Sequence, residues 1–298
     1  MALRNSFITG AVGFFGGILY REKRLQDMFG VKAADEFDTA LVEGVEPKGV
    51  DVEDPVSRTM QFGFPSYDTI RSRKSYVLSY DRRNRIPHWV FEHLTPEHIA
   101  CGEKINRLKR KYFEDDSIHP WFRSTNSDYE HSGFDRGHFA AAANHCRNQE
   151  YWDDTFVLSN MAPQVGRGFN CSAWKKLEMH VRKMVENYKN VYVVTGPLYM
   201  PRLQPDGKKY VIYQVIGPHD VAVPTHFFKV AVGEKENDQF DMEAYVMPNA
   251  PIDKEVPLKD FAVPRDVIER YAGFLLFEKL PNSVFHSING QPVMNKKV

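Results

Sequence analysis

Two short stretches of the chain carry side chains that could catalyse a reaction. Residues 131–138 have the sequence His-Ser-Gly-Phe-Asp-Arg-Gly-His, in which the imidazole of His138 follows an acid, Asp135, and a cation, Arg136. Residues 167–178 place the amide of Asn170 just before a run that should form a helix. An imidazole can take a proton from water, and a hard cation prefers oxygen ligands. These groups suit metal-assisted hydrolysis of a phosphodiester.

The second stretch should lead into an amphipathic helix. Apolar residues recur at steps of three and four over residues 172–188, which predicts a helix with one face against a sheet. Glu178 and Arg182 lie four residues apart on an adjoining face. Taken singly, they could be an exposed ion pair worth about 0.3 kcal/mol, and Asn170 could be a helix cap. The presence of Asn170 at the entrance of the same helix favours a functional interpretation.

Strands are predicted where β-branched and aromatic residues cluster between polar turns. A hairpin is expected from runs at 75–80 and 89–93 around the polar turn 81–85. Further strands are expected at 191–195, 210–216, 225–232 and 242–247, and a second helix at about 265–273. This mixed order predicts an α+β fold with a largely antiparallel central sheet flanked by helices.

The amino-terminal residues differ in composition from the rest. Residues 7–20 are almost wholly apolar and uncharged, with basic residues on both sides and no acid before Glu22. As a helix they would extend about 21 Å, which is short of the roughly 30 Å hydrocarbon core of a membrane. A secretory signal, a cleavable mitochondrial targeting segment and a short inner-membrane anchor are the alternatives. The basic flanks favour the mitochondrial ones, so residues 1–24 are interpreted as a targeting segment or membrane anchor.

Charge is unevenly distributed although the formal net charge is zero. Residues 27–54 hold nine acids against two lysines, a net −7, and we interpret residues 25–60 as an acidic linker before a folded domain at 61–298. Residues 71–111 hold eleven bases against four acids, a net +7. This basic segment is either a solvated face or a contact surface for a polyanion.

Three cysteines, Cys101, Cys146 and Cys171, are too few and too scattered for a disulfide framework. We expect all three to be reduced. A zinc site is not expected, because the short spacings between cysteine and histidine ligands that such sites use are missing.

An ordered series of motifs resembles one nuclease family. It comprises Phe134-Asp135-Arg136-Gly137-His138, then Asn144-His145, then Leu158-Ser159-Asn160-Met161-Ala162-Pro163-Gln164, then Asn170 with Trp174 and Glu178. This series is similar to that of the DNA/RNA non-specific endonucleases with a ββα-metal active site, and to their mitochondrial members in particular. The similarity extends over roughly residues 60–280 in the same order.

The resemblance implies a role for each matching residue. His138 would be the general base, and Asn170 the only direct protein ligand of one Mg²⁺, with Mn²⁺ as an alternative ion. Asp135 and Glu178 would hold water beside the metal, and Asn160 would steady the base or the phosphate. The scissile phosphate would be held by Arg136, Arg182 and, as a further contact, Arg167. His131 and His145 are expected to be structural.

The function that the resemblance implies is a Mg²⁺-dependent endonuclease that cuts DNA and RNA to leave 5′-phosphate and 3′-hydroxyl ends. It also implies a homodimer in the mitochondrial intermembrane space or inner membrane, release to the nucleus and a part in programmed cell death. One alternative is a catalytically idle nucleic-acid-binding or scaffold protein anchored by residues 7–20. Another is an enzyme for a cyclic or lipid phosphodiester. The complete motif set disfavours the first, and the +7 segment disfavours the second.

Overall fold

The computed structural model describes residues 68–102, 105–106, 111–236 and 238–293. The predicted targeting segment 1–24, the linker 25–60 and the basic residues Lys104, Arg107, Lys109 and Arg110 lie outside this range. Within the described residues, no helix has the length and apolar character needed to cross a membrane. The described residues within 69–201 and 209–298 form one compact unit, and residues 202–208 fall outside it.

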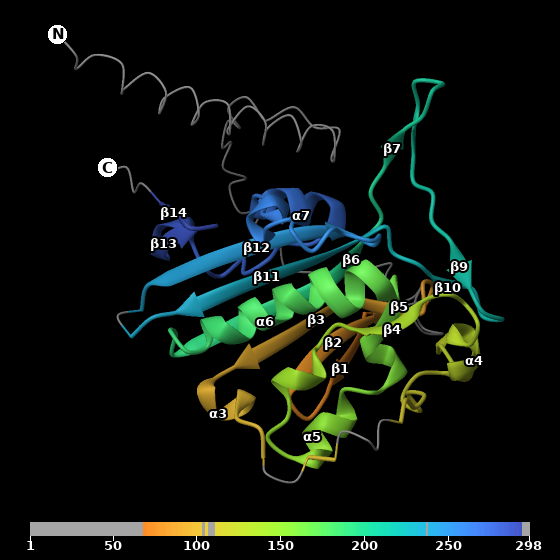
Figure 1. The fold of residues 1–298 in the computed structure, drawn as a ribbon, viewed down its shortest axis with the longest axis horizontal. Coiled ribbons are helices and arrows are strands. Elements are labelled where there is room, and N and C mark those ends of the chain that lie inside the picture. Colours follow the sequence, from red (N-terminus) through yellow and green to blue (C-terminus); the bar gives the residue numbers. More distant parts are fainter. Residues whose placement is uncertain (1–67, 103–104, 107–110, 237, 294–298) are drawn as a thin grey trace, which may run out of the picture. The chain divides into compact units, whose positions relative to one another are not determined.

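The centre of the compact unit is an eight-stranded sheet with the order β1-β2-β3-β6-β11-β12-β13-β14 (Figure 1). Neighbouring strands are antiparallel except β12 and β13, which are parallel. The strands are β1 (Thr69–Ser72), β2 (Tyr76–Asp81), β3 (Ile86–Leu94), β6 (Asn190–Leu198), β11 (His226–Glu234), β12 (Phe240–Pro248), β13 (Phe285–Ile288) and β14 (Gln291–Pro292). The predicted α+β class with a largely antiparallel sheet is confirmed.

One predicted strand is wrong. Residues 210–216 form two separate short strands, β8 (Lys209–Tyr210) and β9 (Val215–Ile216), and not one continuous strand. Val211 and Ile212 between them are 49% and 68% exposed, so this β-branched run is not buried against a core. The other short strands are β7 (Arg202–Leu203) and β10 (Val221–Ala222), of which β10 pairs with β9.

The helices lie between and beside the strands. They are α3 (Pro96–Ile99), α4 (Asn126–Tyr129), α5 (Gln149–Asp154), α6 (Lys175–Met184) and α7 (Arg265–Ala272), with 3₁₀ turns η2 (Pro120–Phe122), η3 (Ala142–Asn144), η4 (Leu158–Asn160), η6 (Leu258–Phe261) and η7 (Asn282–Val284). Helix α7 was predicted, and it ends at Gly273, whose φ of 80° is left-handed. Helix α6 is shorter than the predicted 172–188 at both ends: a π-helical turn, η5 (Gly166–Trp174), precedes it, and it ends at Met184.

The two faces of the sheet contact different segments. Consecutive residues of a strand point to opposite faces, and Phe227 and Phe228 of β11 show which segment lies on each. The ring of Phe227 lies 5.8 Å from that of Phe169 and 5.7 Å from that of Trp174, both in η5. The ring of Phe228 lies 6.3 Å from that of Phe274, after α7. The face of Phe227 is therefore the one that supports η5 and α6.

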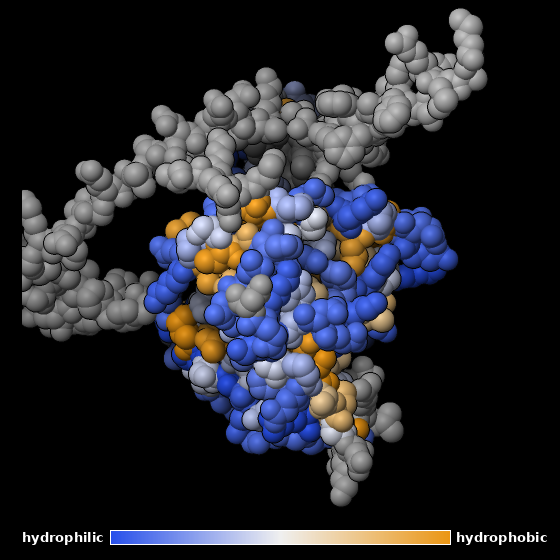
Figure 2. All heavy atoms as spheres, turned by 90° about the vertical axis from the view of Figure 1, so that its left-hand side faces the viewer, coloured by the Kyte–Doolittle hydropathy of each residue, from blue (hydrophilic) through white to orange (hydrophobic). Residues whose placement is uncertain are grey.

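The molecular surface beside the turn from β11 to β12 is mainly polar. Figure 2 shows this side, with hydrophilic residues over most of it and hydrophobic residues in separate small areas. Isolated apolar side chains are ordinary on the surface of a folded protein. This side therefore offers no broad apolar docking surface among the described residues.

The expectation that all cysteines are reduced is wrong for two of them. A disulfide joins Cys101, just after α3, to Cys146, just after η3, with a Cα–Cα distance of 4.5 Å. The N–H of Gly102 donates to the carbonyl of Cys146 at 2.9 Å, so the two segments are already in register there. The partners are 45 residues apart, and only the fold brings them together. Cys171 is free and exposed.

Candidate active site

Both predicted clusters line one open cavity of about 390 Å³. Five of the predicted site residues are on its wall, and they come from strand β4 (Asp135–His138), η5 and α6: Arg136, His138, Asn170, Glu178 and Arg182. His138 and Asn170, which are 32 positions apart in the sequence, therefore face the same space. Asp135, Asn160 and Arg167 do not line the cavity.

A two-stranded ribbon followed by a helix builds this wall. Strand β4 (Asp135–His138) pairs antiparallel with β5 (Met161–Gln164), and the chain then enters η5 and α6. The sequence Asp-Arg-Gly-His can form this ribbon because Gly137 has no side chain. A Cβ at that position would clash with the side chain of Gln164 across the ribbon. The order β4, β5, α6 is the ββα arrangement that the motifs predict.

The imidazole of His138 lies between aromatic rings at the edge of the cavity. Its centroid is 4.9 Å from that of Phe156, edge to face, and 6.3 Å from that of Tyr112. Behind it, Asn160 is fully buried and accepts the Ala140 N–H at 2.9 Å, while its amide donates to the carbonyls of Ala140 and Thr155. Asn160 thus fixes the backbone that follows His138 and does not itself reach the cavity.

The amide of Asn170 has a defined orientation. Its Nδ2 donates to Asp135 Oδ2 at 2.9 Å, which leaves Oδ1 as the atom without a hydrogen-bond partner among the described residues. Asn170 does not cap α6, whose N-cap is Trp174. Asp135 can approach this closely because Gly166 has no side chain; a Cβ there would lie 2.7 Å from Asp135 Oδ2. One amide oxygen is therefore available to a cation.

Glu178 and Arg182 do not form the simple surface ion pair that their spacing allows. Burial raises the pKa of Glu178 to about 7, and the nearby cations Lys229 and Arg182 offset this only in part. Arg182 NH1 instead donates to Asn144 Oδ1 at 3.0 Å. Both side chains face the cavity from successive turns of α6.

The two other predicted phosphate contacts differ. The Arg136 guanidinium lies over the rings of Tyr112 and Tyr129, 5.1 and 5.3 Å from their centroids, and its NH2 donates to the carbonyl of Asn126 at 2.9 Å. It is thus held in place at the cavity wall. Arg167 is exposed, in the turn before Gly168, and lies outside the cavity.

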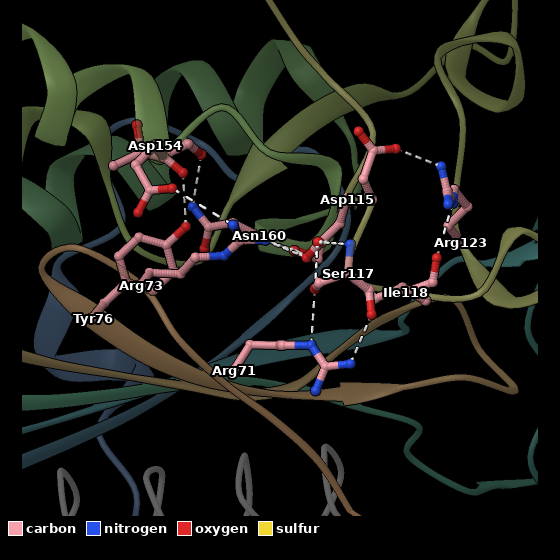
Figure 3. Close-up of polar contacts among 12 residues, drawn as sticks. Arg71, Arg73, Tyr76, Asp115, Ser117, Ile118, Arg123, Asp154 and Asn160 are labelled. Atoms are coloured by element: carbon pink, nitrogen blue, oxygen red, sulfur yellow. Dashed lines mark hydrogen bonds and ion pairs between the residues drawn. The ribbon is translucent and has the colours of Figure 1, made fainter.

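Two arginines of the basic segment 71–111 form ion pairs or hydrogen bonds within the protein itself (Figure 3). Arg73 forms ion pairs with buried Asp115 and with Asp154. Arg71 donates twice to Ser117, through Nε to Oγ and through NH2 to the carbonyl, both at 2.8 Å. These contacts join β1 and its turn to the segment around residue 115. Arg71 and Arg73 therefore stabilise the fold, and a polyanion contact remains a hypothesis for the rest of the basic segment.

Some residues around the cavity were missed from the sequence. Tyr112 and Tyr129 hold Arg136. Asn144, a motif residue to which no role was assigned, accepts a hydrogen bond from Arg182 and donates one to buried Glu92. Lys175 also lines the cavity. Its position three residues before Glu178 places both on one helix face, a signal that could have identified it.

The donor set around Asn170 fits a hydrated ion. Among the described residues, no group of three or more His, Cys, Asp or Glu side chains could hold a metal by itself. Mg²⁺ usually keeps several waters and binds through few protein ligands, whereas structural zinc needs four. The site offers the single amide oxygen of Asn170, which Asp135 orients, with Glu178 on the same cavity wall. This donor set is compatible with Mg²⁺.

Comparison with known proteins agrees with this geometry. The model of the DNA/RNA non-specific endonuclease family matches residues 55–283. Mitochondrial endonuclease G of Caenorhabditis elegans is 50% identical over 226 residues, which cover 76% of this chain and 73% of that protein. The human mitochondrial endonuclease G is 52% identical over 215 residues, covering 72% and 71%. The mitochondrial nuclease of Saccharomyces cerevisiae is 44% identical over 75% of this chain and 70% of that protein.

A solved structure is similar as well. The crystal structure of an EndoG/EndoGI complex, described as showing the mechanism of EndoG inhibition, matches with a TM-score of 0.75 and 53% identity. The match covers 82% of this chain and all of the other. The relatives named above are mitochondrial, and we assign this chain to the same compartment. The chain belongs to the DNA/RNA non-specific endonuclease family and is a metal-dependent nuclease, that is, a phosphodiester hydrolase.

Proposed function

We propose that the protein is a Mg²⁺-dependent, sugar-non-specific endonuclease that cuts DNA and RNA to 5′-phosphate and 3′-hydroxyl ends. The observation that carries the proposal is that the imidazole of His138 and the amide of Asn170 line the same open cavity, together with the guanidinium groups of Arg136 and Arg182. A base, an oxygen ligand and two cations for a phosphate are the groups that this reaction needs.

In this mechanism His138 takes a proton from the water that attacks phosphorus. The new P–O bond forms as the bond to the 3′ oxygen breaks, and that oxygen leaves with the bonding electrons and takes a proton from solvent. Asn170 Oδ1 would hold Mg²⁺, oriented by Asp135, with Glu178 beside it. When bound, the ion would neutralise charge on the phosphoryl oxygens.

The arginines bind the phosphate. Arg182 and Arg136 would bind the scissile group and stabilise the negative charge that develops on it. Asn160 would act by fixing the backbone after His138, in keeping with its hydrogen bonds to Ala140. Contacts with phosphate and metal carry no base information, which is why we infer cleavage of both DNA and RNA with little sequence preference.

The assembly and membrane contacts are also proposals. We infer that the protein is a homodimer in the mitochondrial intermembrane space or at the inner membrane, with residues 7–20 as the membrane contact. We also infer that it is released to the nucleus in programmed cell death. The mitochondrial names of the relatives support the compartment. Mass spectrometry of the native amino terminus would show whether the targeting segment is removed.

A plasmid-nicking assay tests the proposal. His138→Ala should lower the rate in Mg²⁺ by at least about a thousandfold, as expected when a general base is lost together with its support of the attacking water. EDTA should abolish the activity of the parent protein. His131→Asn is a matched control, because it removes an imidazole outside the cavity and asparagine tolerates the φ of 57° at this position.

A His138→Ala protein that nicks plasmid at the parental rate would refute the assignment of the base. A parent protein that binds DNA in Mg²⁺ without cutting it would favour the catalytically idle alternative. Equal rates on plasmid and on bis-nitrophenyl phosphate would favour a small phosphodiester substrate.

A further inference from the structure

Behind the cavity, a buried hydrogen-bonded chain connects the central sheet to Arg182. Asn144 Nδ2 donates to Glu92 Oε1 at 2.9 Å, and Asn144 Oδ1 accepts from Arg182 NH1 at 3.0 Å. Glu92 is on β3 and fully buried, Asn144 ends η3 and is 2% exposed, and Arg182 is on α6. The three residues come from separate elements, so only the folded protein aligns them.

Charge determines which way the Asn144 amide points. A carboxylate only accepts hydrogen bonds and a guanidinium only donates them. With the amide reversed, its NH₂ would face the guanidinium and its oxygen would face the carboxylate, so both hydrogen bonds would be lost. Glu92 Oε1 also interacts with His145 Nε2 at 2.9 Å, which anchors the carboxylate from a second side.

The Glu92 carboxyl is ionised at neutral pH. Burial raises its pKa, but the hydrogen bond from His145, the charge of Lys229 and the hydrogen bond from Asn144 outweigh burial and hold the pKa below its usual range. The carboxylate does not touch Arg182, because the neutral amide of Asn144 lies between them. Within the described part of the chain, Arg182 makes no direct ion pair.

This arrangement has a specific consequence for an anionic substrate. An arginine held by a carboxylate is oriented but largely neutralised, whereas an arginine held by an amide oxygen is oriented and keeps its charge. We propose that Asn144 is a positioning residue that fixes the Arg182 guanidinium in the cavity without compensating its charge, and that Glu92 sets the orientation of the Asn144 amide. The proposal rests on the proposed function, in which Arg182 binds the phosphate.

A reciprocal exchange, Glu92→Gln with Asn144→Asp, tests the idea. It keeps the buried net charge and closely matches the side-chain volumes, but moves the carboxylate into direct contact with Arg182. The amide at position 92 can still donate to the carboxylate at position 144, whereas His145 Nε2, which donates to the Glu92 carboxylate, would have to accept from that amide instead. We expect KM for a double-stranded oligonucleotide in Mg²⁺ to rise at least about tenfold, and kcat to fall as well, because Arg182 would also stabilise the charge that develops on the phosphate. The slope of log kcat/KM against log salt should become shallower by about one, as when one phosphate contact is lost. Circular dichroism and thermal unfolding check the fold.

If the folded exchange variant keeps the parental KM and salt slope, the proposal is wrong. Should the exchange variant not fold, a cycle of Asn144→Ala and Arg182→Ala decides. Asn144→Ala should raise KM in the parent and have no further effect once Arg182 is alanine. Equal effects in the two backgrounds would mean that Asn144 acts through the fold and would overturn the proposal.

The same cycle separates this proposal from the proposed function. If Arg182→Ala leaves KM unchanged, Arg182 does not bind the phosphate, and the proposed function fails at that residue. If Arg182→Ala raises KM but the exchange variant does not, only the role of Asn144 and Glu92 fails.

Discussion

Two carboxyl groups that interact with the charge of Lys229 behave oppositely. Glu92 is on the sheet, where hydrogen bonds from His145 and Asn144 and the charge of Lys229 outweigh burial and lower its pKa. Glu178 is on α6, where burial raises its pKa to about 7 despite Lys229 and Arg182. The difference lies in the hydrogen-bond donors that Glu92 has and that Glu178 lacks among the described residues. Glu92 is fixed through two hydrogen bonds to its Oε1, whereas Glu178 faces the cavity and retains an acceptor for water or a hydrated ion.

The largest effect on the free energy of unfolding should come from removing the carboxylate of Glu92. Glu92→Leu would leave the amide of Asn144, the ring of His145 and the charge of Lys229 without their carboxylate. Loss of one partner of a buried charge cluster costs about 3–5 kcal/mol, so we expect the free energy of unfolding in urea to fall by that amount. Glu92→Gln, which keeps an acceptor oxygen, is the control and should lose clearly less. Equal losses for the two variants would mean that the carboxylate charge does not matter.

Replacing Glu178 should have a smaller effect on the free energy of unfolding than replacing Glu92, and one of opposite sign. Its pKa is about 7 in the folded protein and about 4.5 in the unfolded chain, so between these values the folded state holds more protons and its stability falls as pH rises. In EDTA, Glu178→Gln should match the parent at pH 4 and exceed its unfolding free energy by about 2 kcal/mol at pH 8, with activity lost. The groups that face Glu178 are Lys229, Arg182, Lys175 and Glu92. If the parent loses no stability relative to Glu178→Gln as the pH rises from 4 to 8, Glu178 does not differ from Glu92 in the way proposed.

The smallest effect on the free energy of unfolding is expected at Thr195, which accepts a hydrogen bond from Lys229. Lys229 Nζ donates to Thr195 Oγ1 and, at 3.5 Å, to the carbonyl of Phe139, and it lies 5.2 Å from the centre of the Trp174 ring. Thr195→Val removes an acceptor from this buried cation and should cost about 1–2 kcal/mol of unfolding free energy. Thr195→Ser, which keeps the hydroxyl, should cost less. If valine and serine behave alike, Lys229 is held by the two acids and not by the sheet.

The parts of the molecule that sequence could predict are those set by local periodicity and local motifs. Strands β2, β3, β6, β11 and β12 and helix α7 follow from residue patterns within a few positions. The ribbon of β4 and β5 was implied only by the resemblance to a family. His138 and Asn170 were identified because each has a characteristic neighbourhood in sequence. The run at 210–216 was misjudged because β-branched residues also occur where no core is present to bury them.

The parts that could not be predicted depend on long-range packing. Asn144 and Glu92 are 52 residues apart, Arg182 and Asn144 are 38 apart, and the cysteines of the disulfide are 45 apart. No spacing rule connects them, because their meeting depends on how α6 and η3 pack against β3. Arg167 is the opposite case: it lies three residues before Asn170 in sequence, but the turn at Gly168 leaves it exposed and outside the cavity.

The bond between Cys101 and Cys146 closes a covalent ring around the stretch that contains Asp135, Arg136 and His138. A protease that cut the backbone once anywhere between these two cysteines would therefore produce two fragments that stay attached. They would separate on a gel only after a reductant is added, so an apparently intact band under non-reducing conditions could be a nicked enzyme with His138 on either fragment.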